Sequence, residues 1–178
     1  MKKSLIVIFV VCLAITGFVG ISALVSGEFD ELTVRILFTT AALSFYSLIG
    51  LTCVAQLGRT TDMLGKLGLA FCAVALLHAI FTTWTTLNGF EHIQNRAALA
   101  FVGLAIAHAC LMKMISAKSM TVSVLVIIAI ASVVLNTILA ISMLYGVSMD
   151  GITVLGIIGI IATCSTIAAP ALNLASSD

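Results

Sequence analysis

Six long apolar runs constrain this chain more than any other feature of its sequence. They cover residues 5–25, 32–55, 67–87, 97–112, 121–145 and 152–169. A helix that crosses a bilayer needs about 20 predominantly apolar residues. The one charged residue inside these runs is Arg35, which comes one turn after the second run begins. We therefore predict an all-α integral membrane protein with six transmembrane helices, forming a single bundle over residues 1–178.

The balance of charged and apolar residues leads to the same class. Of the 178 residues, 62% are apolar and 8% are charged, against roughly 25% charged in a soluble domain. In a bilayer most of the surface faces hydrocarbon, and helices satisfy the backbone hydrogen bonds internally. The net charge is +1, and no basic cluster is longer than Lys2-Lys3. We therefore expect membrane lipids as partners and exclude nucleic acid.

The lysines and arginines predict the orientation, because basic residues accumulate in cytoplasmic loops. With the N-terminus inside, the cytoplasmic segments hold Lys2, Lys3, Arg59, Lys66, Lys113 and Lys118, and the opposite segments hold Arg35 and Arg96. Six spans then return the C-terminus to the cytoplasm. Lys2-Lys3 followed at once by a span is typical of a bacterial plasma-membrane protein. The first run is longer than a usual signal-peptide core, so we expect it to be retained rather than cleaved.

A seven-residue motif occurs twice, 61 residues apart. The first copy, residues 29–35, reads FDELTVR, and the second, residues 90–96, reads FEHIQNR. A degraded third copy begins at Met149-Asp150. A period near 60 residues is the length of one helical hairpin, so the repeat favours an arrangement of three tandem hairpins in parallel orientation. Each copy lies between two apolar runs, where we expect a turn on the outer membrane face.

The two motif copies supply a candidate outer-face polar site for a ligand or partner. It comprises Asp30, Arg35, Glu91, His92 and Arg96. Their local roles are also predictable. Asp30 is a good helix N-cap, Asn88 and Glu91 fit a capping box, and acids paired with Arg35 and Arg96 along a helix stabilise it. Capping and interfacial anchoring are the simpler explanation of these residues.

Two histidines lie inside predicted spans, where an ionisable side chain indicates a functional site. His78 is near the middle of the third run, and His108 is in the fourth. Histidines on facing helices can ligate haem iron or another metal. Packed imidazoles that hydrogen-bond to neighbouring helices are the simpler alternative, so we predict no cofactor, with haem as the alternative. The five cysteines lie in or beside apolar runs without a CxxC motif, which is typical of small buried side chains.

Smaller features concern helix packing. Hydroxyl residues such as Thr40 and Ser44 follow helical spacing and favour contacts between spans over a polar pathway. Small residues from Ala97 to Ala107 form a stripe that permits a close helix contact or a homo-oligomer interface. The single proline, Pro170, is expected to end the sixth helix.

No catalytic motif is present in the sequence. We therefore predict a non-enzymatic accessory or assembly subunit that acts beside a membrane-protein partner. The alternatives are a small oligomeric transporter or channel, and a haem- or quinone-linked redox protein that uses His78 and His108.

Overall fold

The computed structural model describes the chain apart from residues 1, 27–29, 58–61, 86–89, 116–118, 147–150 and 176–178. The described part is helical, with no strand. Its six helices are α1 (Lys2–Ser26), α2 (Glu31–Gln56), α3 (Asp62–Thr85), α4 (Phe90–Lys113), α5 (Met120–Leu144) and α6 (Gly151–Ala175). The all-α prediction is confirmed.

Four of the described helices have the length and apolar composition of membrane spans. They are Glu31–Gln56, Met63–Thr85, Ile93–Lys113 and Met120–Leu144, and a shorter apolar stretch covers Ile157–Asn173. Their exposed side chains are largely aliphatic or aromatic, for example Val74, Leu77 and Phe81 at 67% exposure each. Such a surface suits hydrocarbon rather than water, so the chain has the build of a membrane protein.

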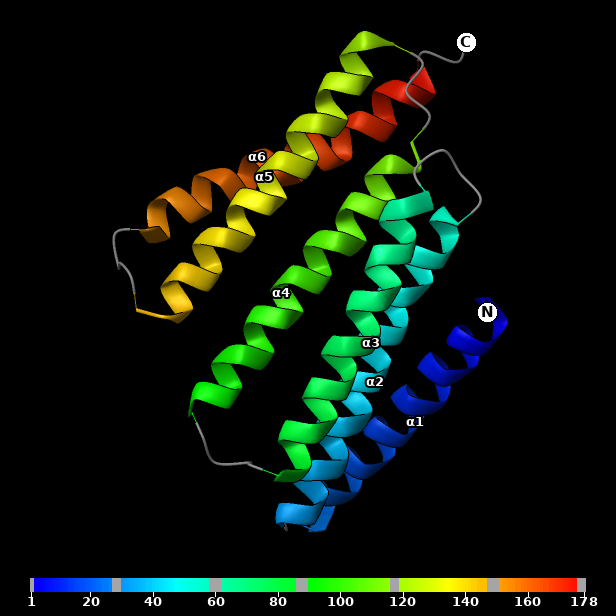
Figure 1. The fold of residues 1–178 in the computed structure, drawn as a ribbon, viewed down its shortest axis with the longest axis vertical. Coiled ribbons are helices and arrows are strands. Elements are labelled where there is room, and N and C mark those ends of the chain that lie inside the picture. The colour runs from blue at the N-terminus through cyan, green and yellow to red at the C-terminus, as the bar shows by residue number, and fades with distance from the viewer. Residues whose placement is uncertain are drawn as a thin grey trace.

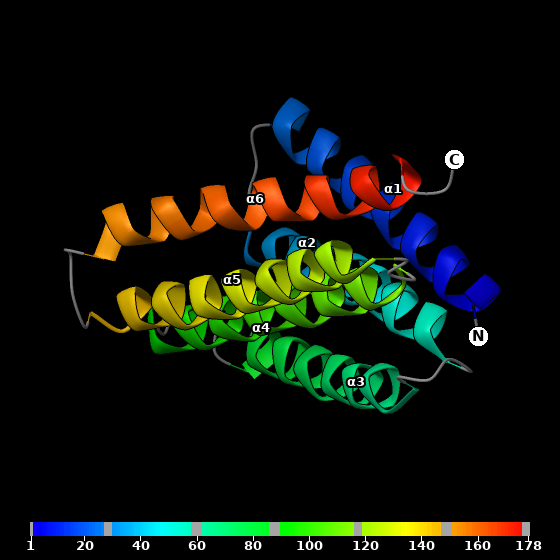
Figure 2. The same ribbon diagram turned by 90° about the horizontal axis from the view of Figure 1, so that it is seen from above.

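The helices α2, α3 and α4 pack against one another and form the centre of the molecule. On one flank α1 packs along α2, and on the other α5 packs along α4 and pairs with α6 (Figure 1). Viewed from above, α3 and α6 lie on opposite sides of the molecule, with α4 and α5 between them (Figure 2). The largest buried cluster joins α2, α3 and α4 through Tyr46, Ile49, Cys53, Cys72, Ala75, Ala79, Ala107 and Cys110.

Close approach of α2 and α3 depends on glycine. A Cβ at Gly65 would lie 2.7 Å from the carbonyl oxygen of Cys53, and one at Gly68 would lie 2.5 Å from the Cys53 sulfur. At Gly103 of α4 a Cβ would lie 2.9 Å from Ile49. Small residues at such positions let helix backbones approach closely in a membrane. The predicted small-residue stripe on α4 is thus partly a contact with α2.

Polar side chains in this bundle satisfy helix carbonyls that would otherwise lack a partner. The last four carbonyls of a helix have no intrahelical donor, and in hydrocarbon no water replaces it. Arg35 Nη1 donates to the Trp84 carbonyl at the end of α3 at 2.5 Å. Gln56 donates to the Cys110 carbonyl at the end of α4 at 2.5 Å, and Gln94 donates to the Leu144 carbonyl at the end of α5 at 2.8 Å. Three helix ends are therefore capped from a neighbouring helix.

Two sequence-based expectations about helix bounds are wrong. Residues 90–96 are the first turns of α4 rather than a turn between helices, because their polar side chains find partners on α3 and α5. Gln56, the residue after the second apolar run, is the last residue of α2 and is fully buried. Pro170 lies inside α6, which continues to Ala175. Proline removes a single N–H donor, and membrane helices tolerate that loss.

The hydroxyls of α2 also differ from expectation. Thr40 donates to the Ile36 carbonyl at 2.8 Å, and Ser44 donates to the Thr40 carbonyl at 2.9 Å. Both hydroxyl groups thus donate to carbonyls of their own helix. The two side chains therefore contribute to helix packing through their small size and do not donate a hydrogen bond to a neighbouring helix. The third motif copy and the Asn88 cap fall on residues 147–150 and 86–89, outside the described part.

Candidate ligand pocket at the end of helix α3

The two arginines of the repeated motif meet at the carboxyl end of α3. Arg35 reaches it from α2, with its guanidinium 5.8 Å from the centre of the Trp84 ring. Arg96 reaches it from α4, where its Nε donates to the Thr82 hydroxyl at 2.8 Å. The carboxyl end of a helix carries a partial negative charge that favours cations. The arginines of the two motif copies therefore bind the same end of α3, at positions two residues apart.

In the first motif copy the N-cap and the ion pair both form between residues of that copy. Asp30 accepts a hydrogen bond from the Thr33 backbone N–H at 2.9 Å, as an N-cap should. Bonds from the Thr33 side chain and backbone lower the pKa of the Asp30 carboxyl below its ordinary value. Arg35 pairs with Glu31 one turn earlier, with 2.5 Å between Nη2 and Oε1. The predicted cap and the predicted pairing along the helix are both confirmed in this copy.

The second motif copy is connected differently. Gln94 and Asn95 bind the end of α5, where Asn95 accepts a hydrogen bond from the Tyr145 hydroxyl. Arg96 turns toward α3 and does not point out to an interface. The side chains of Glu91 and His92 lie outside the described residues. The structure thus brings Arg35 and Arg96 to one helix end, and the five-residue outer-face site stays a prediction.

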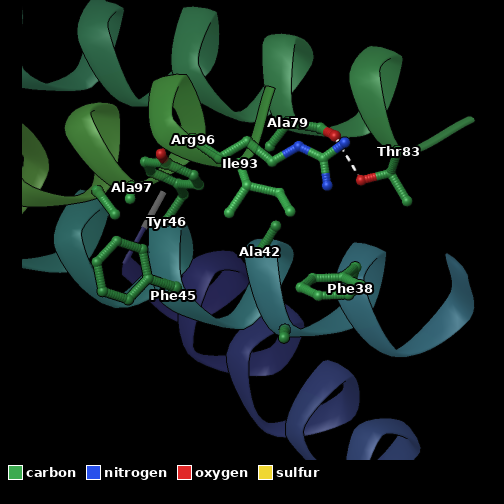
Figure 3. A pocket seen from close by; sticks show the side chains of 11 residues that line it. Phe38, Ala42, Phe45, Tyr46, Ala79, Thr83, Ile93, Arg96 and Ala97 are labelled. Atoms are coloured by element: carbon green, nitrogen blue, oxygen red, sulfur yellow. Dashed lines mark hydrogen bonds between the residues drawn. The ribbon is translucent and has the colours of Figure 1, made fainter. Parts of the chain in front are cut away.

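Beside Arg96 lies an open pocket of about 530 Å³ lined by residues of α2, α3 and α4 (Figure 3). Its volume falls within the range of small-molecule sites, about 300–1,000 Å³. The lining residues are Phe38, Ala41, Ala42, Phe45, Tyr46, Ala79, Thr83, Ile93, Arg96, Ala97 and Ala100. The walls are almost entirely apolar, and small alanines on all three helices create the space. Sequence reasoning did not find this pocket.

Arg96 is the one charged residue among these lining side chains. It lies six residues into α4, about 9 Å along the helix from its start. Its Nη2 is buried and has no hydrogen-bond partner. Figure 3 shows the guanidinium at the same end of the pocket as Thr83, whose hydroxyl donates to the Ala79 carbonyl at 2.7 Å. The pocket therefore has a single cationic end and an apolar body.

The two intramembrane histidines lie apart from this pocket. His108 Nε2 is 3.5 Å from the Thr166 hydroxyl of α6, and His108 lines a second pocket of about 330 Å³ between α2 and α4. Since α3 lies on the opposite side of the molecule from α6, this contact turns His108 away from the helix of His78. His78 Nε2 is buried without a partner. No hydrogen bond joins the two rings in the described part, and haem or metal ligation stays an untested alternative.

Cysteine side chains form a further buried group that the sequence spacing did not reveal. Cys53, Cys72 and Cys110 come from three different helices and share one core cluster. The sulfurs of Cys53 and Cys110 are 3.9 Å apart. Cys164, by contrast, is exposed on α6. The predicted burial is confirmed for the first three cysteines and is wrong for Cys164. Among the described residues, no group of three or more His, Cys, Asp or Glu could hold a metal ion.

The helices and the pocket define an α-helical protein of membrane-protein build, with a ligand-sized pocket between three of its helices. Comparisons with protein-family models, with curated proteins and with solved structures gave no match.

Proposed function

We propose that this chain is a non-enzymatic membrane protein that binds a lipid-like ligand in the pocket between α2, α3 and α4. The observation that carries the proposal is the pocket itself, with its volume of about 530 Å³ and its apolar walls. An accessory subunit beside a membrane-protein partner, as the sequence predicts, would use such a site to hold or present a membrane component without changing it.

The exposure of the pocket rim supports entry from the bilayer. Phe38 and Ile93 line the pocket and are 52% and 55% exposed. Both belong to helices of membrane-span composition, so the solvent beside them would be acyl chains. A lipid-like molecule would enter sideways without crossing water.

The helix framework around the pocket supports a site that exists before the ligand arrives. Trp84 donates to Thr39 at 3.1 Å, and Arg35 and Gln56 bind carbonyls of α3 and α4. Hydrogen bonds between helices hold the three walls at fixed distances. A preformed site loses less conformational entropy when it binds.

Within the proposal the chain crosses the plasma membrane six times, with both termini in the cytoplasm. Helices α1 and α6 are 25 residues long each, enough to cross about 30 Å of hydrocarbon. The charge asymmetry then places the end of α3 and the pocket nearer the outer face. Reporter fusions after Lys113 and after Tyr145 test this topology, because the two positions should report opposite sides. Equal signals would contradict it.

A small transporter is the second candidate, and the same pocket favours it, because a carrier also needs a site among its spans. Flux of the bound ligand across proteoliposomes separates the two. An accessory binding protein retains the ligand, whereas a transporter moves it between compartments.

The variant Ala100→Leu tests ligand binding directly. Ala100 lines the pocket, so a leucine there should occupy the cavity and displace an apolar ligand while the protein remains folded. Ala73→Leu is the matched control, because Ala73 is an exposed residue of α3. Native mass spectrometry from a mild detergent should detect co-purifying lipid on the wild type and on Ala73→Leu, and much less on Ala100→Leu. Equal occupancy in all three proteins would contradict binding in this pocket.

A further inference from the structure

The electrostatic state of Arg96 identifies the kind of ligand that the pocket takes. A guanidinium stays protonated inside proteins and presents five N–H donors. In the pocket one donor, on Nε, binds the neutral Thr82 hydroxyl, while Nη2 is buried without a partner. Arg96 as a whole is partly buried, and a desolvated cationic group that lacks a counterion is costly, more so at membrane depth.

The neighbouring groups that the structure describes do not remove this cost. Glu31 is paired with Arg35 at 2.5 Å, and no ion pair to Arg96 occurs among the described residues. The α3 carboxyl end offers roughly half an elementary charge, which favours the cation without filling its free donors. Thr83 uses its hydroxyl hydrogen on the Ala79 carbonyl, so it presents an acceptor to the pocket rather than a negative charge.

We infer that the pocket binds a single-chain amphiphile whose head is a carboxylate or a phosphate monoester. This inference rests on the ligand-binding function proposed above. The anionic head would accept charge-assisted hydrogen bonds from Arg96, which are about twice as strong as neutral ones. The tail would lie along Ala97, Ala100 and Tyr46.

The shape of the site favours an amphiphile over a small free anion. Arg96 is one charged group among eleven lining residues, and most of the others are apolar. Placing a hydrated inorganic anion in such a site would remove its water and return few hydrogen bonds. An acyl tail, in contrast, gains about 25 cal/mol for each Å² of apolar surface that it buries. One drug-sized cavity suits one chain better than the two chains of a phospholipid.

A headgroup series tests the inference. The delipidated full-length protein, in a mild neutral detergent, is titrated with hexadecanoate, hexadecyl phosphate and hexadecanol, and bound molecules are counted by native mass spectrometry. Parallel arms add inorganic phosphate or acetate as competitors. The variants are Arg96→Gln, Arg96→Lys, Ala100→Leu and, as an exposed cation at the other end of α4 and outside the pocket, Lys113→Gln.

We expect the two anionic amphiphiles to bind one per chain and more tightly than hexadecanol. A charge-assisted hydrogen bond contributes about 1.5–3 kcal/mol, so Arg96→Gln should weaken hexadecanoate roughly ten- to a hundred-fold and leave hexadecanol unchanged. Arg96→Lys should keep part of the preference, because its ammonium retains the charge without the planar fork. Lys113→Gln should bind like the wild type.

Every other outcome contradicts either the anionic head of the ligand or the proposed ligand-binding function as a whole. Equal binding of acid and alcohol, lost in Ala100→Leu but not in Arg96→Gln, would overturn the anionic head and keep the proposed function. Displacement of hexadecanoate by inorganic phosphate or acetate at equal concentration would assign the site to small anions. Absence of saturable binding by any chain would overturn both proposals. If Arg96→Gln does not fold, the comparison of acid with alcohol on the wild type still decides.

Discussion

The close contact of α2 with α3 leads to a sharp prediction at Gly65. The variant Gly65→Ala adds a single methyl group whose carbon would lie 2.7 Å from the Cys53 carbonyl oxygen and 3.2 Å from the Gln56 Cβ. Neither atom is the free end of a side chain, so the two helices must separate. The control is Gly17→Ala, because a Cβ at Gly17 of α1 meets no atom within 4 Å.

The magnitude follows from two opposing terms. Replacing glycine by alanine inside a helix stabilises it by about 0.8–1 kcal/mol, and this gain is common to both variants. Overpacking costs about 1–3 kcal/mol and applies to Gly65 alone. We therefore expect Gly65→Ala to be less stable than Gly17→Ala by about 1–3 kcal/mol. For a chain of this size each kcal/mol shifts the melting temperature by about 2–4 °C.

Thermal unfolding in detergent, followed by circular dichroism, provides the measurement. Gly68→Ala should fall between the other two variants, because its nearest atoms belong to side chains, the Cys53 sulfur at 2.5 Å and Ile106 Cγ2 at 2.9 Å, and side chains shift more easily than a backbone carbonyl. Adding Cys53→Ala should recover part of that loss. Coincident melting of Gly65→Ala and Gly17→Ala would refute the close approach of α2 and α3.

Two further predictions concern the polar side chains. Gln56→Leu keeps a side chain of similar volume but removes the donor to the Cys110 carbonyl. It should destabilise the protein by about 1–3 kcal/mol. A melting temperature equal to that of the wild type would show that the α4 end has another donor. His92→Glu places a carboxylate one turn before Arg96, as Glu31 is placed before Arg35; the resulting pair should weaken hexadecanoate binding without changing hexadecanol binding, and an unchanged acid affinity would contradict the assigned role of Arg96.

Periodic and local features of this fold were predictable from sequence. Long apolar runs predict helices because hydrocarbon leaves the backbone no other partner. The Asp30 cap and the Arg35–Glu31 pair depend on spacings of three and four residues, which a helix converts directly into contacts. Sequence position alone was sufficient for these because both partners belong to one helix.

Features that join different helices were not predictable. Gln56 closes an apolar run and resembles the start of a loop, yet its amide reaches α4. The pocket exists because alanines of α2, α3 and α4 face one point, and their register across helices is set by side-chain packing. The start of α4 was misplaced for the same reason. Gln94 and Asn95 are polar in sequence but find partners on α5, which permits a helix where a turn was expected.

The repeated motif shows how one sequence difference separates a structural arginine from a candidate binding arginine. In both copies the arginine ends the motif and reaches the carboxyl end of α3. Four residues before it stands Glu31 in the first copy and His92 in the second. A carboxylate at that offset neutralises Arg35 within its own helix turn. Histidine carries no negative charge in either protonation state, so the second copy lacks an acid at this position. Arg96 then lines a cavity with an unpartnered nitrogen, and the charge that completes it is best supplied by a ligand.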